Sequence, residues 1–343
     1  MPDELRWGDP GRRNSAISTS QHPGVVAVAG EALVDIVPAP VGDYLEIAPG
    51  GSPANVAVGL ARLGVPVRLL ARIADDVLGR RVRAHLEGNG VDLTHAVRAA
   101  EQTSLAMVAV SPDGVPSYDF RVDGTADWQW TADELAGALD PGPAGPVVAV
   151  HSGSLALTTP PGAAVLRALL ERATATATVS YDPNCRPLLM GEPAAVLAGV
   201  YAVLAVADVV KVSSEDLGWL LPGADPVDVV DDWLGRGPAL VAVTLGPDGV
   251  VAGTRAGLRL RRPGAAVAVV DTVGAGDTFS AALLAGLHGR GLLGAAARDG
   301  LAALDEPAAA ALLDRAALAA ALTCARRGAD PPTVGELDLA RSP

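Results

Sequence analysis

The sequence of 343 residues is poor in cysteine and in basic residues, and each shortage excludes a class of protein. Its two cysteines, Cys185 and Cys324, cannot build a disulfide framework or a four-cysteine metal site, and they fit a reduced, cytoplasmic chain. Lysine and arginine total 26 against 39 acidic residues, so the net charge is −13. An acidic chain has no general affinity for nucleic acid or for an anionic membrane. A polyanion such as a nucleotide would have to be bound locally, by backbone N–H groups, a metal or a few cations.

Long uninterrupted apolar runs are also absent from the sequence. Residues 1–24 carry Arg12 and Arg13 but no apolar segment after them, so we expect a flexible leader and no signal peptide. The apolar stretch 301–325 is interrupted by charged residues such as Asp314, so we expect no transmembrane helix. Because 50% of the residues are hydrophobic, the chain can nevertheless form one large or two ordinary domains.

Short apolar runs alternate with helical patterns along the chain. A run such as residues 25–30, which ends in glycine, predicts a buried strand. Buried strands that alternate with helices indicate an α/β fold, with a mainly parallel sheet covered by helices on both faces. We expect strands at residues 25–30, 67–71, 147–150, 178–181, 209–212 and 240–244, and helices at residues 163–173 and 193–205.

Two segments have a different pattern. Residues 38–48 and 103–128 alternate apolar and polar side chains, and the second segment contains turn residues at 112–114. This alternation is typical of half-exposed antiparallel strands. We expect a small sheet that projects from the main body without being an independent domain, because part of the main fold separates the two segments.

A glycine-rich motif around Asp277 has the strongest chemical signal. We expect an apolar strand at residues 265–270 before it and a helix at residues 278–287 after it. Gly274 and Gly276 leave backbone N–H groups exposed at the helix N-terminus, where unpaired donors and the helix dipole favour an anion. Asp277 places a carboxylate in this anion site. It would either remove a proton from a hydroxyl that attacks a phosphate, or only cap the helix.

A second glycine motif covers residues 50–64. Ser52 predicts a helix N-cap, Pro53 suits the first helical turn, and Gly64 suits the end of the helix. Asn55 lies in the first turn of this otherwise apolar helix, where a carboxamide needs a polar partner. That partner is either a sugar hydroxyl or a local backbone group.

Asp35 lies among apolar residues after the first predicted strand. Ligands of open α/β sheets bind beyond the carboxyl ends of the strands. Asp35 is therefore a candidate for binding two hydroxyl groups of a ligand, although an acidic residue after a strand is usually solvated.

The two glycine motifs, in their order and separation, resemble the two signatures of the ribokinase-like (PfkB-type) sugar kinase family. Within the family they are most similar to the fructokinase-like branch, and the resemblance covers residues 25–337. It includes residues 181–186, which are similar to the Asp-Pro-Asn-x-Arg strand end of the family. Further similar stretches are residues 207–213, 243–249, 327–329 and 331–333.

The resemblance implies a ribokinase-like α/β fold and ATP-dependent phosphorylation of a sugar hydroxyl. Asp277 would deprotonate the hydroxyl, and the backbone of Gly274, Ala275 and Gly276 would stabilise the transferring phosphoryl group. The residues implied at the sugar are Asp35, Gly51, Asn55, Arg121 and Arg186, and those implied at the nucleotide are Lys211, Ser213, Thr244, Gly246, Gly249, Gly276 and Cys324.

The resemblance also implies the organisation of the chain. Residues 25–337 would form one kinase domain between the leader and a tail at residues 338–343. Strands at about residues 36–49 and 103–128 would form a lid that closes over the sugar and excludes water. ATP and Mg²⁺ would be the cofactors, and a potassium requirement and a homodimer are both left open.

The chain departs from the family pattern at two places. The family often has Asn-x-x-Glu near the waters bound to magnesium, where this chain has Ser213-Ser214-Glu215-Asp216. Asp216 is then the candidate that would reach the metal through water. Arg121 stands where fructokinase-like relatives often have an aromatic residue. It would either contact the substrate or be solvated on an edge of the lid.

The resemblance favours a ketohexose such as fructose as the substrate. The alternative sugar is 2-keto-3-deoxygluconate, because Arg121 or Arg186 could bind its carboxylate. A nucleoside is disfavoured, because the lid segment has few aromatic residues that could stack on a base. The alternative of a different class is a catalytically silent, sugar-binding regulatory protein. Asp277 argues against that alternative, because a silent protein needs no base.

Overall fold

An eight-stranded sheet forms the body of the protein in the computed structural model, which describes residues 23–39, 42, 44–110 and 116–340. The order is β14-β13-β12-β11-β10-β9-β1-β4, parallel from β4 to β12 and antiparallel at β13 and β14. The strands are β1 (Val25–Ala29), β4 (Val67–Leu70), β9 (Val147–Gly153), β10 (Thr178–Asp182), β11 (Val209–Ser213), β12 (Leu240–Thr244), β13 (Val250–Thr254) and β14 (Arg259–Arg262). Every strand predicted for this sheet from 25–30 through 240–244 is present, and the predicted α/β fold is confirmed.

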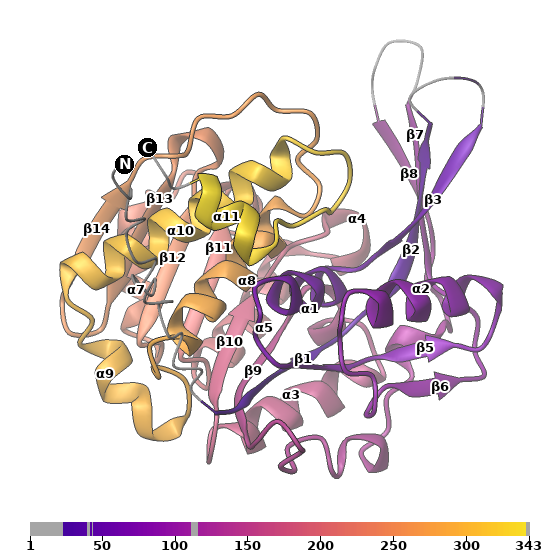
Figure 1. The fold of residues 1–343 in the computed structure, drawn as a ribbon, viewed down its shortest axis with the longest axis horizontal. Helices are drawn as coiled ribbons and strands as arrows, with labels where there is room; N and C mark the ends of the chain where they lie inside the picture. Colours follow the sequence, from indigo (N-terminus) through magenta and orange to yellow (C-terminus); the bar gives the residue numbers. More distant parts are fainter. Residues whose placement is uncertain (1–22, 40–41, 43, 111–115, 341–343) are drawn as a thin grey trace, which may run out of the picture.

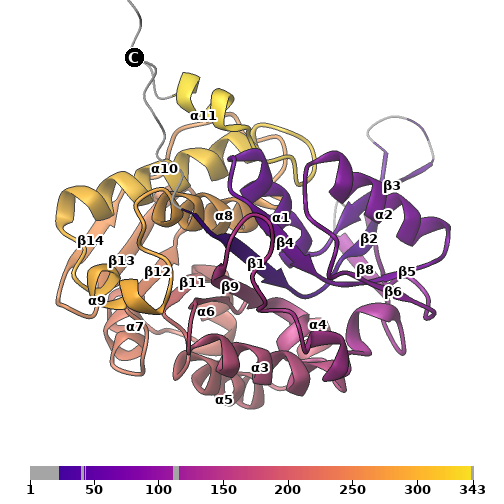
Figure 2. The same cartoon turned by 60° about the horizontal axis from the view of Figure 1, so that its bottom comes forward.

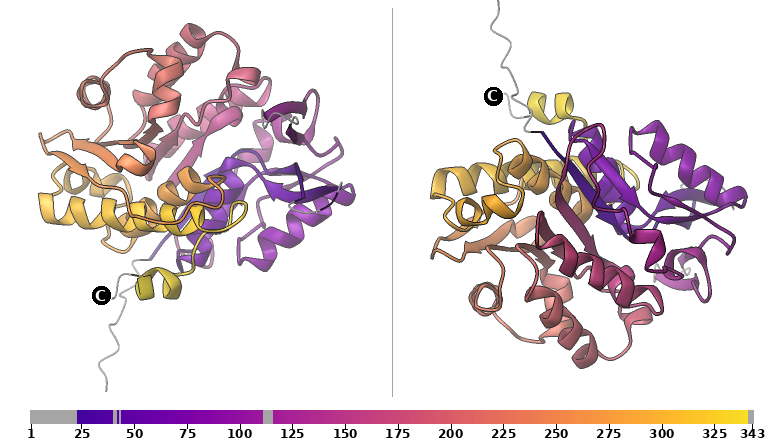
Figure 3. Two further views of the ribbon diagram at one scale, coloured as in Figure 1. Left: turned by 90° about the horizontal axis from the view of Figure 1, so that it is seen from above. Right: turned by 90° about the horizontal axis from the view of Figure 1, so that it is seen from below.

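Two layers of helices cover the sheet, one on each face (Figures 2 and 3). Neighbouring side chains on a strand point to opposite faces, so a strand made only of apolar residues, such as β1, makes both faces of the sheet apolar. On β1, Val26 and Val28 pack in one buried cluster, and Ala27 and Ala29 pack in the other. The first cluster includes residues of α1 (Ser52–Arg62), α2 (Val77–Gly88), α8 (Ala275–His288) and α10 (Glu306–Cys324), and the second includes residues of α3 (Gly162–Ala173), α5 (Pro193–Leu204), α6 (Ser214–Leu220) and α7 (Pro226–Leu234). The helices predicted from periodicity, α3 and α5, are both present.

A four-stranded sheet, which we call the lid sheet, projects from the body (Figure 1). Its order is β3-β2-β7-β8, with β2 parallel to β7 and the other pairs antiparallel. Its strands are β2 (Leu33–Pro38), β3 (Leu45–Gly50), β7 (Leu105–Val110) and β8 (Pro116–Arg121).

The predicted small sheet is confirmed, but its extent differs from the prediction. Only Gly30–Ala32 separate β2 from β1, so the lid sheet begins earlier than expected. Ala126–Trp128 form a 3₁₀ helix instead of a strand. The turn predicted at residues 112–114 lies outside the described residues.

The remaining elements are short. They are β5 (Arg72–Ala74), β6 (Val97–Ala99), α4 (Pro187–Met190), α9 (Arg298–Ala302), α11 (Val334–Ala340), and the other 3₁₀ helices Asp133–Leu135, Ser154–Leu157, Gly246–Asp248 and Ala295–Ala297. The helix α11 continues beyond residue 337, where we expected the tail to begin. Arg315 on α10 donates to the Asp338 carboxylate on α11 at 2.8 Å, so residues of the expected tail pack on the body.

The strand predicted at residues 265–270 is wrong. This segment is not part of a strand, and the side chains of Val269 and Val270 are 64% and 65% exposed. The Val270 N–H donates to the Cys324 carbonyl at 2.8 Å, at the end of α10. An apolar run becomes a strand only where a neighbouring strand can satisfy its backbone groups. The helix predicted at residues 278–287 is present as part of α8.

Among the described helices, α10 alone is long and apolar enough to cross a membrane, judged by its 19 residues and a mean hydropathy of 1.3. A third of the residues in its apolar window, 33%, are buried. Leu312 and Leu313 are buried in the same cluster as α8, and Thr323 Oγ1 donates to Thr278 Oγ1 at 2.9 Å. The expectation that this segment does not cross a membrane stays a prediction.

Candidate active site

The side chains of the two glycine motifs meet at the end of the sheet where its parallel strands end. The helices α1 and α8 both begin there and pack side by side (Figures 1 and 2). Parallel strands end at the same edge, so residues that follow β1, β10 and β11 also reach this place. Three groups of polar side chains gather at this edge, around Asp277, Lys211 and Asp35.

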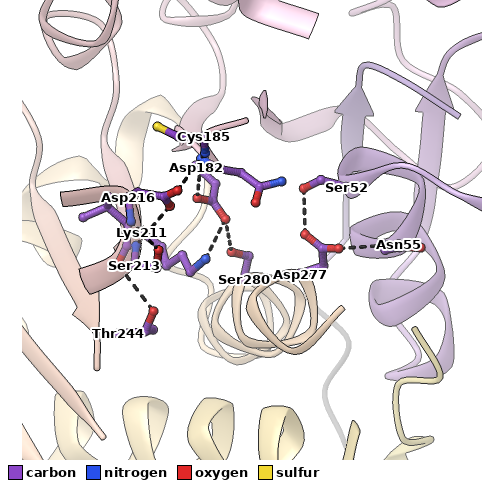
Figure 4. Close-up of polar contacts among 12 residues, drawn as sticks. Ser52, Asn55, Asp182, Cys185, Lys211, Ser213, Asp216, Thr244, Asp277 and Ser280 are labelled. Carbon is purple, nitrogen blue, oxygen red and sulfur yellow. Dashed lines mark hydrogen bonds and ion pairs between the residues drawn. The ribbon is translucent and has the colours of Figure 1, made fainter. Parts of the chain in front are cut away.

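Asp277 lies in the first turn of α8 and joins the two glycine motifs (Figure 4). The residue is buried, and both oxygens of its carboxylate accept hydrogen bonds from α1. Ser52 Oγ donates to Oδ1 at 2.7 Å, and Asn55 Nδ2 donates to Oδ2 at 2.8 Å. The first turn of α1 therefore fixes the position of the Asp277 carboxylate, which belongs to the first turn of α8.

These contacts correct the roles predicted for three residues. Gly274 is the N-cap of α8 and Asp277 makes no capping bond, so capping does not explain Asp277. Ser52 is not an N-cap either, because Gly51 occupies that position and the Ser52 hydroxyl donates to Asp277. The Asn55 amide donates to this carboxylate and not to the local backbone. The sequence around Asn55 could not indicate this partner, because Asp277 lies far away along the chain.

The electrostatics of Asp277 suit a proton acceptor. Burial raises the pKa of Asp277, and the hydrogen bonds from Ser52 and Asn55 offset this only in part. Each carboxylate oxygen keeps a second lone pair when it accepts one hydrogen bond. Because a general base works best with a pKa near the operating pH, the raised pKa favours proton removal over a purely structural role.

The backbone before Asp277 forms a site for an anion. Gly274 has φ +75°, a left-handed conformation that costs glycine little, and a Cβ there would lie 2.6 Å from Ala329 Cβ. Helix geometry leaves the N–H groups of Gly276 and Asp277 without an intrahelical acceptor. A Cβ on Gly276 would lie 2.7 Å from Lys211 Nζ. The missing side chain thus lets a cation lie directly beside the N-terminus of α8.

That cation belongs to the single lysine of the chain. Lys211, on β11, is buried, and its Nζ donates to Asp182 Oδ2 at 2.9 Å (Figure 4). Ser280 Oγ donates to the same oxygen at 3.4 Å. Burial alone would lower the pKa of Lys211, but the carboxylates of Asp182, Asp216 and Asp277 together raise it. Lys211 therefore keeps its charge beside the anion site.

Asp216 lies beside this ion pair and is engaged by backbone groups. Its Oδ1 accepts from the Cys185 N–H at 2.8 Å, and its Oδ2 accepts from the Ser213 N–H at 3.4 Å. Ser213 Oγ accepts in turn from the Asp216 N–H at 3.0 Å, which completes a capping box at the start of α6. Ser213 and Asp216 thus have a structural role in addition to any role at a ligand.

The carboxylates present fit Mg²⁺ only as an ion that keeps its waters. In the described part of the chain, no three His, Cys, Asp or Glu residues are arranged to hold a metal. Mg²⁺ bound with a nucleotide normally keeps several waters and uses one or two carboxylates besides the phosphates. Asp182 and Asp216, both beside Lys211, suit this mode of binding.

Asp35 begins the third group of polar residues. It lies on β2, and burial raises its pKa to about 6, although Arg186 lowers it in part and Asp277 raises it further. Arg186 follows β10 and is itself exposed, with Nη1 donating to Asn184 Oδ1 at 2.8 Å. Asp35 and Arg186 therefore bring opposite charges from the lid sheet and the main sheet to the same edge.

Comparison with known proteins identifies the family. Residues 25–334 match the pfkB family of carbohydrate kinases. The chain belongs to this family. A fructokinase of Rhizobium leguminosarum bv. trifolii is 34% identical over 288 residues, which cover 83% of this chain and 85% of the relative. The similarity to this relative therefore extends over most of the length of both proteins.

Solved structures of the same family have the same fold. A fructokinase from Xylella fastidiosa with bound ATP has a TM-score of 0.82 and 30% identity, covering 92% of this chain and 97% of the other. A double mutant of the Vibrio cholerae O395 fructokinase, solved with fructose, ADP and potassium ion, has a TM-score of 0.76 and 27% identity. That match covers 93% of this chain and 96% of the other. The ribokinase-like fold expected from the motifs is confirmed.

Several residues predicted at the kinase site lie away from these groups or have structural roles. Arg121 is 62% exposed and pairs with Asp119 on the same strand, which supports the solvated alternative. Gly249 is buried against the backbone at Arg262, where a Cβ would lie 2.0 Å from the carbonyl oxygen. Gly246 is exposed after β12, and its nucleotide role stays a prediction.

Thr244 and Cys324 are placed by contacts with the backbone. Thr244 Oγ1, at the end of β12, donates to the Val212 carbonyl at 3.4 Å. Cys324 ends α10 and is partly buried, and its carbonyl accepts from the N–H groups of Val270 and Asp271. Cys324 therefore contacts the segment that leads to Gly274, whereas Thr244 contacts β11.

Two further buried carboxylates at this edge of the sheet, Asp182 and Glu31, were given no role from the sequence. Asp182 was visible as a polar residue at the end of a buried run, the same signal that drew attention to Asp35. Glu31 follows β1 and is buried, and burial raises its pKa to about 7. Its Oε2 has no hydrogen-bond partner in the structure. Neighbouring Ala32 donates its N–H to the buried Asp127 at 2.7 Å, so the link between β1 and β2 is firmly held.

Proposed function

We propose that this kinase transfers the γ-phosphoryl group of ATP to a hydroxyl of fructose. The observation that carries the proposal is the buried Asp277 carboxylate at the glycine-rich N-terminus of α8, held by Ser52 and Asn55. A base and an anion site lie within one helical turn of each other, as transfer of a phosphoryl group to a hydroxyl requires. The fructokinases among the relatives supply the choice of sugar.

In this proposal Asp277 accepts the proton of the attacking hydroxyl, while the backbone N–H groups of Gly274 to Gly276 stabilise the charge of the transferring group. Ala275 contributes less than Gly276, because its N–H already donates to the Thr272 carbonyl at 3.3 Å. Lys211 adds a positive charge on the same side. Most of the rate enhancement then comes from position and electrostatics.

The sugar would lie between the lid sheet and α1. Asp35 and Asn55 would bind its hydroxyl groups. Gly51 would lie beside them at the start of α1, where its φ of +102° and the Glu31 carbonyl, 2.6 Å from the position of a Cβ, leave room for glycine only. Arg186 would lie at the rim of this site. Closure of the lid sheet over the sugar would exclude water as a competing acceptor of the phosphoryl group.

Mg²⁺ would be held by ATP phosphates and, through water, by Asp216 and Asp182. The ion would neutralise phosphate charge when bound. Because the Vibrio cholerae relative was solved with a potassium ion, we extend the proposal to a potassium requirement, which ADP release in potassium and sodium buffers would test. We also propose a cytoplasmic location, where ATP is available and the two free cysteines stay reduced.

The deciding experiment is an ADP-release assay over a panel of sugars, with fructose, glucose, ribose and 2-keto-3-deoxygluconate as acceptors. We expect the highest kcat/KM with fructose, and with Asp277→Asn a release rate lowered by roughly 10²–10⁴. Preference for 2-keto-3-deoxygluconate would replace fructose as the substrate while leaving the kinase chemistry in place. If no sugar releases ADP but fructose still binds in calorimetry, the protein is a silent sugar-binding member of the family.

A further inference from the structure

The loop that follows α10 contacts the lid sheet, the segment before α8 and the helix α1, which all have roles in the proposed reaction. Residues 325–333 follow α10 and lie between the lid sheet, the N-terminus of α8 and the end of α1 (Figure 1). The contact with α1 is made by Arg62, whose Nη1 donates to the Pro331 carbonyl at 2.7 Å. None of the roles assigned above uses the side chains of this loop.

Arg327 makes the contact between this loop and the lid sheet. Its Nη2 donates to the Pro38 carbonyl at 2.8 Å and to Glu46 Oε2 at 2.9 Å. Pro38 ends β2 and Glu46 lies on the paired strand β3, so one guanidinium group holds both strands of the hairpin. We call these two hydrogen bonds the lid latch.

The two residues after Arg327 contact the segment that leads to the anion site. The Gly328 N–H donates to Asp271 Oδ2 at 2.8 Å, while Asp271 Oδ1 accepts from the Val273 N–H at 3.1 Å. Ala329 occupies the space where a side chain on Gly274 would lie. Three consecutive residues thus connect the lid sheet to the N-cap of α8.

We propose that Arg327 is a positioning residue that couples closure of the lid sheet to the arrangement of the anion site. This proposal rests on the proposed kinase function, and it adds a coupling between the binding of the sugar and the binding of the nucleotide. When the latch is formed, the position of the lid and that of the loop at residues 271–274 are no longer independent. A sugar that favours the closed lid then favours the loop arrangement that binds phosphate, and a nucleotide favours lid closure by the same factor.

The size of the coupling follows from the exposure of the latch. The side chains of Arg327 and Glu46 are 43% and 41% exposed, so solvent screens the ion pair. Exposed pairs of this kind change an equilibrium by about two- to fivefold. Arg327 therefore modulates binding and is not needed for the fold.

Binding of a non-hydrolysable ATP analogue, AMP-PNP, measures this coupling directly. Calorimetry gives the Kd of AMP-PNP without and with saturating fructose, and the ratio of the two is the coupling factor. We expect a factor above one for the wild type. For Arg327→Met we expect a factor that is lower by about two- to fivefold, with the Kd without fructose changed less than twofold. The double variant Glu46→Arg/Arg327→Glu should recover part of the factor.

Arg326→Met is the matched control. Arg326 lies in the same loop but pairs with Asp330 and Glu336, not with the lid sheet. We expect it to keep the wild-type factor. A wild-type factor of one, a factor unchanged by Arg327→Met, or an equal fall in Arg326→Met would overturn the latch.

A second measurement does not depend on the identity of the sugar. Hydrogen exchange followed by mass spectrometry reports on the backbone of β3 (Leu45–Gly50). AMP-PNP alone should slow this exchange in the wild type and in Arg326→Met, but not in Arg327→Met. If fructose does not bind, the choice of substrate fails while this exchange still tests the latch. Equal protection of β3 in all three proteins contradicts it.

Discussion

Asp277 and Asp182 are two buried aspartates at the same edge of the sheet, and they are held in opposite ways (Figure 4). Asp277 accepts hydrogen bonds from two neutral groups, the Ser52 hydroxyl and the Asn55 amide. Asp182 accepts from an ammonium group, Lys211 Nζ, at 2.9 Å. The first arrangement leaves a carboxyl whose raised pKa prepares it to take up a proton. The second keeps a cation in place beside the N-terminus of α8.

The difference shows how one residue type serves two purposes in one site. Neutral donors orient a carboxylate without cancelling the effect of burial, so Asp277 keeps a pKa above its usual range. A cation forms a unit with its partner, and neither member can be removed without leaving a buried charge. Variants of the two groups should therefore fail in different ways, one in catalysis and the other in folding.

The largest expected effect is that of Asp277→Asn on turnover. Loss of a general base lowers kcat by roughly 10²–10⁴. Calorimetry should find AMP-PNP binding largely retained, and thermal unfolding should find a folded protein, because the amide keeps the size of the side chain. Turnover near the wild-type value would reduce Asp277 to a structural residue and remove the contrast with Asp182.

Lys211→Met should instead damage stability. Removing the ammonium leaves Asp182 buried without its cation, which destabilises a protein by about 3–5 kcal/mol. Urea unfolding measures the loss, and the double variant Asp182→Asn/Lys211→Met should recover much of it. The control is Arg236→Met, which breaks the exposed ion pair with Asp232 and should cost less than about 1 kcal/mol. Equal losses in the two single variants would contradict the distinction.

Glu31 extends the comparison to a buried carboxyl with one oxygen left unpartnered. Burial raises its pKa from 4.5 to about 7, so the folded protein binds the proton more tightly than the unfolded chain. The stabilisation from this proton is complete below pH 4.5 and is lost as the pH rises through about 7. Relative to Glu31→Gln, the wild type should lose about 3 kcal/mol of unfolding free energy between pH 4.5 and pH 8.

Urea unfolding of both proteins across this pH range measures the difference. Asp35, Asp127 and Asp277 also have raised pKa values, but they are common to both proteins and largely cancel in the comparison. Parallel stability curves for wild type and Glu31→Gln would show that Glu31 is ionised at neutral pH in the folded protein.

Among these variants, Ser52→Ala should have the smallest effect on activity, and it tests whether a neutral donor sets the pKa of Asp277. The Ser52 hydrogen bond lowers the pKa of Asp277, so its loss raises that pKa further. The acid limb of the kcat/KM profile should move to higher pH, and kcat/KM at its optimum should fall by about fivefold, the equivalent of one hydrogen bond. Ser280→Ala removes a hydroxyl that donates to Asp182 instead, and its acid limb should not move.

Local patterns in the sequence were enough to predict much of the fold. The strands from Val25–Ala29 to Leu240–Thr244 were recognisable because parallel strands are buried on both faces and are therefore continuous apolar runs. The run at residues 265–270 has the same composition but pairs with no strand among the described residues. Its apolar pattern could not reveal this, because strand pairing depends on a partner elsewhere in the chain.

The features of the candidate site also separate into those that depend on local sequence and those that depend on packing between distant segments. The sequence by itself determined that Gly274 to Asp277 would combine an anion site with a carboxylate, because glycines before a helix expose backbone donors whatever the rest of the chain does. Only the tertiary structure decided what holds that carboxylate. Ser52 and Asn55 are 225 and 222 residues away from Asp277, and their hydrogen bonds exist because α1 packs beside α8. Side-chain hydrogen bonds act over about 3 Å, so a contact between such distant residues is set by packing and not by local pattern.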